Sequence, residues 1–145
     1  MDPIKQALQD ATLYVDEDSY RLVKLHPSAI TAAAGVIAEV GEPFGVLIAD
    51  KDEVSLVLPD EAIADFANRL VDLEMGDTYK LLTIEAVLPP DLIGFMAVVS
   101  RALADAEVGV FPYAAYSRDH ILVPAHQVTA AIEAFDKLKA RYQDT

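Results

Sequence analysis

Residues 103–123, LADAEVGVFPYAAYSRDHILV, decide the fold, because this stretch is typical of a helix end followed by two strands. Val108 to Tyr116 is apolar enough to form one strand, and His120 to Val123 forms the second. The polar run Ser117-Arg118-Asp119 between them predicts a hairpin turn. Pro124 then ends the second strand and opens a helix, since proline is tolerated in the first helical turn.

The segment before this hairpin predicts a strand and then a helix. The strand runs from Tyr79 to Leu88 and is long and apolar. Asp91 can cap the following helix, in which apolar residues recur at helical spacing as far as Ala106. The C-terminal half therefore has the order strand, helix, strand, strand, helix.

The N-terminal half repeats that order. A strand at Tyr20 to Leu25 precedes a helix that Ser28 can cap, and a hairpin then joins two strands. Pro59 ends the hairpin and opens a helix, as Pro124 does in the second half. Because the order and the prolines both recur, we interpret the chain as an internal duplication. The two hairpin strands are expected at Phe44 to Ala49 and at Val54 to Leu58.

Each half needs a fourth strand to complete a ferredoxin-like βαββαβ unit. Val71 to Met75 can supply it in the first half, whereas the second half ends with its helix. A short strand at Thr12 to Val15, followed by a polar turn at Asp16 to Ser19, is the available donor. The predicted fold is therefore α+β with two such units. The first spans residues 17–76, and the second spans 77–145 with 1–16 contributing a helix and the fourth strand.

Three segments resemble the ACT domain, namely LIGFMA at 92–97, LADAEVGVF at 103–111 and AAYSRDHILV at 114–123. More narrowly, the chain resembles the tandem ACT-domain family that includes the cytosolic arginine sensor and small bacterial proteins of unassigned role. It departs from that family at Arg118, where threonine is common, and at Ala115, where serine or threonine is frequent. The resemblance implies a ligand seated between adjacent domains, against the first strand of the hairpin.

The expected ligand site joins the loop at Asp91 to that hairpin strand. A helix N-terminus leaves N–H groups unpaired and carries partial positive charge, which suits a carboxylate. Gly94 can admit a ligand or serve packing alone, Asp91 can cap the helix or bind an ammonium group, and Tyr113 can line the site or simply pack. The predicted site residues are Pro90, Asp91, Leu92, Ile93, Gly94, Val110, Phe111, Pro112, Tyr113 and Ala114.

The sequence lacks the patterns that mark catalytic and cofactor sites. Its three histidines show no metal-ligand spacing, and its serines lack the G-x-S-x-G elbow. Neither glycine-rich phosphate motif occurs, and the absence of cysteine excludes thiolate ligands and nucleophiles. We therefore expect no catalytic residues, no metal and no cofactor.

Charge and hydropathy limit the partners and the compartment. Acidic residues number 24 against 11 basic ones, so the formal net charge is -13, which repels nucleic acid and anionic membranes. The simplest role of that charge is to keep the protein in solution. Asp2 and Pro3 stand where a signal peptide needs basic residues, and prolines and Asp91 interrupt the apolar stretch from Ala86 to Val99. The expected location is the cytoplasm.

Two functions remain open from the sequence. The first is a regulatory module that binds a small molecule, which the resemblance implies is an amino acid. The alternative is a non-catalytic dimerisation or interaction protein without a working ligand site. Apolar residues on both faces of the predicted strands also favour a homodimer. In a sheet with one solvent-exposed face, apolar and polar residues alternate more strictly along each strand.

Overall fold

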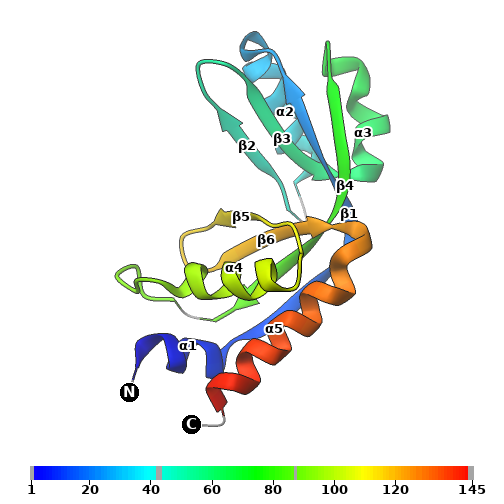
Figure 1. Ribbon diagram of the computed structural model, residues 1–145. Helices are drawn as coiled ribbons and strands as arrows, with labels where there is room; N and C mark the ends of the chain where they lie inside the picture. Colours follow the sequence, from blue (N-terminus) through cyan, green and yellow to red (C-terminus); the bar gives the residue numbers. More distant parts are fainter. Residues whose placement is uncertain (1, 42–43, 87, 144–145) are drawn as a thin grey trace. The chain divides into compact units, whose positions relative to one another are not determined.

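The computed structural model describes residues 2–41, 44–86 and 88–143, and the chain divides into two compact units (Figure 1). One unit is formed by residues 17–79. The other combines the N-terminal segment up to Asp16 with the segment that begins at Lys80. Val87, at the end of a predicted strand, lies outside the described residues.

The unit of residues 17–79 is a four-stranded ferredoxin-like unit. Its sheet has the order β2-β3-β1-β4, in which β3 pairs antiparallel with both β1 and β2. The crossovers are α2, which ends where Gly41 adopts a positive φ of 65°, and α3. The elements are β1 (Thr12–Leu25), α2 (Ile30–Val40), β2 (Val46–Ala49), β3 (Val54–Pro59), α3 (Asp60–Phe66) and β4 (Glu74–Glu85).

The second unit repeats this topology with one borrowed strand. Its sheet has the order β5-β6-β4-β1, so the N-terminal part of β1 lies beside the C-terminal part of β4. The structure thus confirms the predicted fold class, including completion of the C-terminal unit by the N-terminal strand. The further elements are α1 (Pro3–Asp10), α4 (Phe95–Asp105), β5 (Phe111–Ala114), β6 (Asp119–Pro124) and α5 (Val128–Gln143).

Two predicted breaks in the chain are wrong. Asp16 to Ser19 was expected to turn, but β1 runs without interruption from Thr12 to Leu25. Likewise β4 begins at Glu74 and replaces two separate predicted strands, while Val71 and Asp72 lie in the turn before it. Each long strand takes part in the sheets of both units, so ladder hydrogen bonds override the turn preference of short polar side chains.

In both units the chain passes from the hairpin into the next helix with the same backbone conformation. Pro59 has φ -52° and ψ 134°, and Pro124 has φ -51° and ψ 137°, so the chain turns alike at the two equivalent places. Pro59 leads directly into α3, whereas Pro124 leads into a short 3₁₀ turn, Ala125–Gln127, before α5. The repeated prolines therefore mark equivalent corners, as the sequence predicts.

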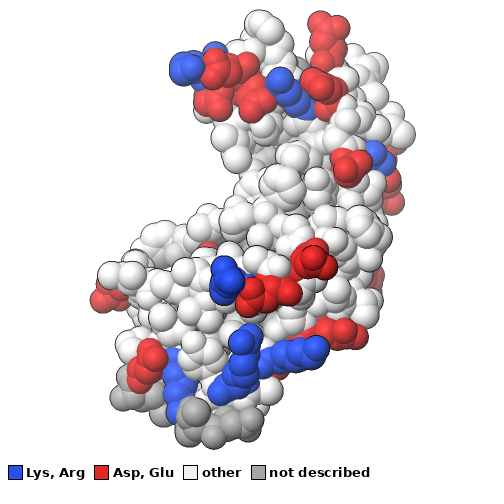
Figure 2. Space-filling view, in the orientation of Figure 1, with Lys and Arg blue, Asp and Glu red and all other residues white. Residues whose placement is uncertain are grey.

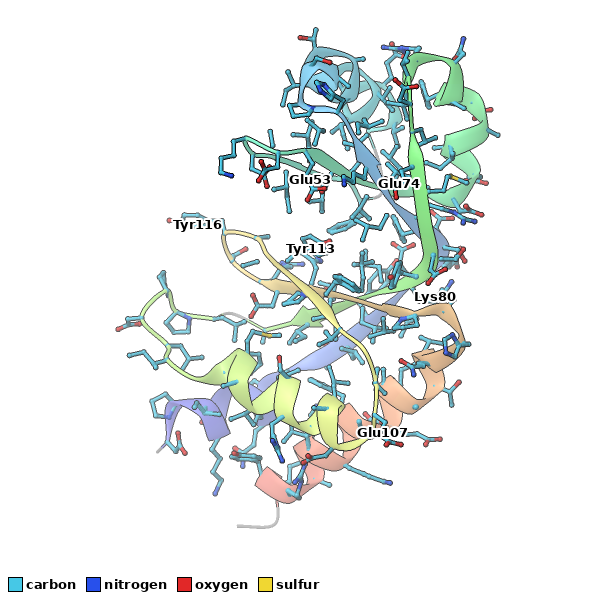
Figure 3. All side chains as sticks on the ribbon, turned by 45° about the horizontal axis from the view of Figure 1, so that its top comes forward. Glu53, Glu74, Lys80, Glu107, Tyr113 and Tyr116 are labelled. Carbon is cyan, nitrogen blue, oxygen red and sulfur yellow. The ribbon has the colours of Figure 1, made fainter. Side chains whose placement is uncertain are left out.

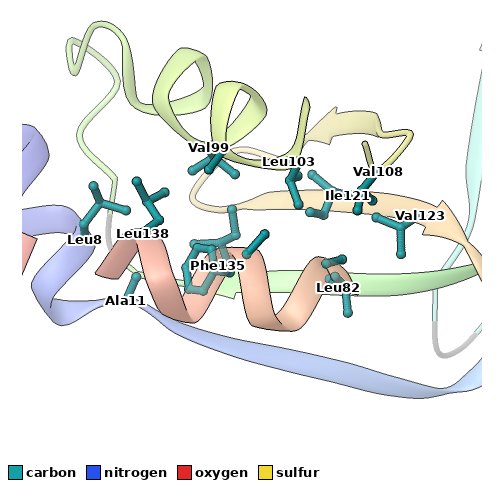
Figure 4. Packing of buried hydrophobic residues seen from close by; sticks show 14 of the residues in the cluster. Leu8, Ala11, Leu82, Val99, Leu103, Val108, Ile121, Val123, Phe135 and Leu138 are labelled. Carbon is teal, nitrogen blue, oxygen red and sulfur yellow. The ribbon is translucent and has the colours of Figure 1, made fainter. Parts of the chain in front are cut away.

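The core of the second unit lies between its helices and one face of its sheet (Figure 4). Val99 and Leu103 of α4, with Phe135 and Leu138 of α5, pack against the strands. Helix α1 joins this core because Leu8 and Ala11 are fully buried. Its end is tied to α5, since Lys139 Nζ donates to the Ala11 carbonyl and Gln9 Nε2 donates to the Tyr142 carbonyl at 3.1 Å.

Candidate ligand site

The loop between β4 and α4 is shaped by prolines and one glycine. Pro89 and Pro90 favour extended backbone before them, and Leu92 N–H closes a turn by donating to the Pro89 carbonyl at 3.0 Å. Gly94 then has φ 91°, a left-handed backbone conformation that residues with a side chain rarely adopt. Any Cβ there would also stand 3.3 Å from Ile4 Cδ1 of α1. The backbone thus requires glycine at this position.

Helix α4 starts later than the sequence suggests. It begins at Phe95, with Gly94 as its N-cap, so the prediction that Asp91 caps it is wrong. The prediction that Ser28 caps α2 is wrong as well, because a 3₁₀ turn precedes α2 and its N-cap is Ala29. Among the described residues no side chain caps α4, and its first intrahelical bond runs from Val98 N–H to the Gly94 carbonyl. The start of α4 therefore keeps donors and partial positive charge for another acceptor.

The β5–β6 hairpin faces this loop with a short polar turn. Ala114 pairs with Asp119, and Ala115 N–H donates to the Arg118 carbonyl at 3.0 Å, which closes the turn. Figure 3 shows Tyr116 at the tip of the hairpin, where its side chain is 99% exposed. Arg118 Nη1 reaches back to β4 and donates to Glu85 Oε2 at 2.8 Å.

Loop, helix start and hairpin turn together enclose a cavity of about 440 Å³, called here the loop–hairpin cavity. This volume falls at the small end of the range of small-molecule sites. One wall is the loop and the first turn of α4, and the opposite wall is the hairpin turn. The described lining residues are Leu88, Pro89, Pro90, Leu92, Gly94, Phe95, Met96, Ala97, Ala114, Ala115, Tyr116, Ser117, Arg118 and Asp119.

Two titratable groups beside the cavity have shifted pKa values. Burial raises the pKa of the Asp119 carboxyl, and the neighbouring His120 opposes that rise. Burial also lowers the pKa of His120; the positive charge of Arg118 lowers it further, while Asp119 and Glu85 act in the opposite direction. His120 Nδ1 lies 2.8 Å from the hydroxyl of Thr83, which is buried on β4. Asp119 is thus a partly desolvated carboxyl at the cavity wall, a position that favours pairing with a cation.

The structure brings together part of the predicted site. Pro90, Leu92, Gly94 and Ala114 all line the loop–hairpin cavity. Asp91 and Ile93 instead line a separate depression of about 440 Å³ against the start of α1, and Ile93 is 87% exposed.

The remaining predicted residues lie outside the cavity lining. Val110 packs against the core, and Phe111, Pro112 and Tyr113 belong to β5, the end strand of its sheet. Pro112 therefore marks an edge strand, one of the alternatives that the sequence left open. Sequence reasoning missed Arg118 and Asp119, whose signal was a charged pair in the turn that the fold places opposite the loop.

A larger depression of about 710 Å³ lies between α4 and α5. Figure 2 shows basic side chains gathered over these helices beside acidic ones, and Asp105, Glu133, Lys137 and Arg141 border the depression. Its floor consists of alanines, and the backbone donors of both helices are used within the helices. It therefore offers a small ligand fewer directed polar contacts than the loop–hairpin cavity does.

The described part of the chain offers neither a metal site nor a membrane-spanning helix. Within it, no cluster of three or more His, Cys, Asp or Glu side chains is arranged to hold a metal ion. No helix among those residues is both long enough and apolar enough to cross a bilayer.

The two units define a ferredoxin-like α+β protein, and comparisons with known proteins narrow this class. Residues 74–137 match the model of the ACT domain family. This segment is therefore similar to an ACT domain. No curated protein matches the chain.

Solved structures share the fold over almost the whole chain. A protein of unknown function from Vibrio cholerae is 19% identical with a TM-score of 0.72, covering 94% of this chain and 96% of that one. A protein from Agrobacterium tumefaciens is 19% identical with a TM-score of 0.71, covering 89% of each chain. The regulatory subunit of aspartate kinase from Thermus thermophilus is 12% identical with a TM-score of 0.70, covering 87% and 95%. Identities this low show the fold alone.

Proposed function

We propose that the protein is a regulatory module that binds a free amino acid in the loop–hairpin cavity, without catalysing a reaction. The observation that carries the proposal is the cavity itself, which joins the uncapped start of α4 to Arg118 and Asp119. The start of α4 supplies N–H donors, and Arg118 a positive charge, for the carboxylate of an amino acid. Asp119 supplies a partly buried carboxyl for its ammonium group. The ACT-domain match and the regulatory subunits among the structural neighbours support the same conclusion. We place this module in the cytoplasm.

A thermal-shift screen of the twenty amino acids tests the proposal. A ligand present at about 100 times its dissociation constant is expected to stabilise the fold by about 2.7 kcal/mol. Ala115→Trp should abolish that shift, because Ala115 is an exposed turn residue whose enlargement fills the cavity. Ala140→Trp, which fills the α4–α5 depression instead, is the matched control and should leave the shift intact. No shift with any amino acid would contradict the proposal.

The two end strands of the sheet support the alternative function, an interaction protein. Ile48 on β2 is 47% exposed and Phe111 on β5 is 41% exposed, and both strands have an open edge. Such edges can pair with a second copy, so a homodimer stays a prediction. The argument from apolar residues on both strand faces is weaker, because Leu81 and Leu122 are already buried on the sheet face away from the helices. Sedimentation of a clean monomer near 15.7 kDa would contradict the dimer.

A further inference from the structure

We propose that the loop–hairpin cavity selects neutral amino acids with an apolar side chain, and that Arg118 and Asp119 are the residues that determine this specificity. The inference rests on the proposed function, because it names the class of ligand for the same cavity. It is drawn from the wall of the cavity, its charge balance and the unused bonding capacity of the two residues.

The wall opposite the hairpin turn is apolar. Phe95 is buried, and Leu88, Leu92 and Met96 are half-buried around the cavity. Burying apolar ligand surface against such a wall is favourable by roughly 25 cal/mol per Å². A charged ligand side chain placed there would lose its hydration without a partner. The wall therefore favours an aliphatic or thioether side chain over a carboxylate or an ammonium.

The formal charges of the described lining cancel. Arg118 is its one cation and Asp119 its one anion. A zwitterionic amino acid with an uncharged side chain presents one carboxylate, which can lie against Arg118 beside its existing partner Glu85, and one ammonium, which can lie against Asp119. An acidic or basic amino acid brings a further charge for which this lining holds no partner, which costs desolvation energy.

Both residues retain unused bonding capacity. A guanidinium carries five N–H donors in a planar fork, and the described structure uses Nη1 of Arg118 for Glu85. The Asp119 carboxyl is half-buried in the cavity lining beside His120, it carries two acceptor oxygens, and burial raises its pKa. We assign the ligand carboxylate to Arg118 beside the start of α4, and the ligand ammonium to Asp119.

Isothermal titration of the full chain tests the selection. L-leucine and L-methionine are expected to bind at least about ten-fold more tightly than L-aspartate and L-lysine, since an unpaired charge costs more than 1.4 kcal/mol. If a charged amino acid binds as tightly as leucine, the inference is overturned while the proposed function stands. If no amino acid binds, the proposed function itself fails.

Variants test the assigned roles. Arg118→Gln should weaken L-leucine about ten-fold or more and leave L-leucinamide, which lacks the carboxylate, nearly unchanged. Arg118→Lys should recover part of the loss. Asp119→Asn should weaken L-leucine similarly but leave 4-methylpentanoate, which lacks the ammonium, unaffected. Arg101→Gln, which removes a cation paired with Asp105 on the exposed side of α4, is the control. Equal losses for leucine and leucinamide in Arg118→Gln would overturn the role of Arg118.

Discussion

Gly94 shows how a single residue shapes the start of α4 and one wall of the cavity. Its positive φ lets the chain leave the proline-containing loop and enter the helix within one residue. The sequence offered ligand approach or packing as reasons for this glycine. Its backbone conformation is a third reason, and no periodicity or spacing in the sequence reports a dihedral angle.

Replacing Gly94 by alanine should destabilise the protein by about 1–2 kcal/mol, because a left-handed conformation penalises any Cβ. The contact of 3.3 Å with Ile4 Cδ1 adds to the cost. Urea denaturation of the full chain measures the change in the free energy of unfolding. Gly109→Ala is the control, since its Cβ would meet Pro124 at an ordinary 3.6 Å and should change stability by less than about 0.5 kcal/mol. Equal losses in both variants would contradict this explanation.

At the same scale, the sequence predicted the position of the cavity better than its polar groups. Leu92, Gly94 and Ala114 were expected from the family resemblance, and they line the cavity. Asp91, for which the sequence leaves capping or ammonium binding open, lies outside the cavity because α4 starts later. Arg118 and Asp119 escaped notice because a charged turn is normally just solvated, and only the folded hairpin places this one opposite the loop.

At the scale of elements, the single long strand β1 replaces the two strands and the turn that the sequence predicts. Periodicity identified its apolar ends correctly, but the four polar residues from Asp16 to Ser19 carry no signal for strand continuation. Pairing with strands far away in sequence decides the outcome: β4 lies beside β1 in the sheet, and β3 pairs with β1 from Tyr20 onward. The first turns of the helices were predicted less well, since α4 begins at Phe95 and α5 at Val128, both later than the sequence suggests.

Removal of residues 1–16 should destabilise the C-terminal unit selectively. The deletion removes the buried Leu8 and Ala11 and also the strand that lies beside the C-terminal part of β4. Hydrogen exchange is expected to show lost protection in Lys80 to Glu85. Protection of β3 in the other unit serves as the internal control, because its partners all remain. Undiminished protection in Lys80 to Glu85 would contradict the strand assignment.

At the scale of the whole molecule, two units of the same topology differ in the chemistry that they present. Both units contain ion pairs, such as the 2.7 Å pair between Arg21 and Asp60 in the unit of residues 17–79 and the 2.8 Å pair between Arg118 and Glu85 in the other. Among its described residues, the other unit has a helix start without a side-chain cap, the half-buried Asp119 carboxyl and a cavity between them. Duplication of the fold therefore leaves room for a binding role in one copy.

Backbone amide mapping by NMR tests the central claim most directly. The full chain, labelled with ¹⁵N, would be titrated with the amino acid that gives the largest thermal shift. Binding in the loop–hairpin cavity predicts saturable shifts centred on Leu92 to Ala97 and on Ala114 to Asp119, with β3 unchanged. Shifts centred on the α4–α5 depression, around Ala130 to Arg141, or on the end strands alone would contradict the account.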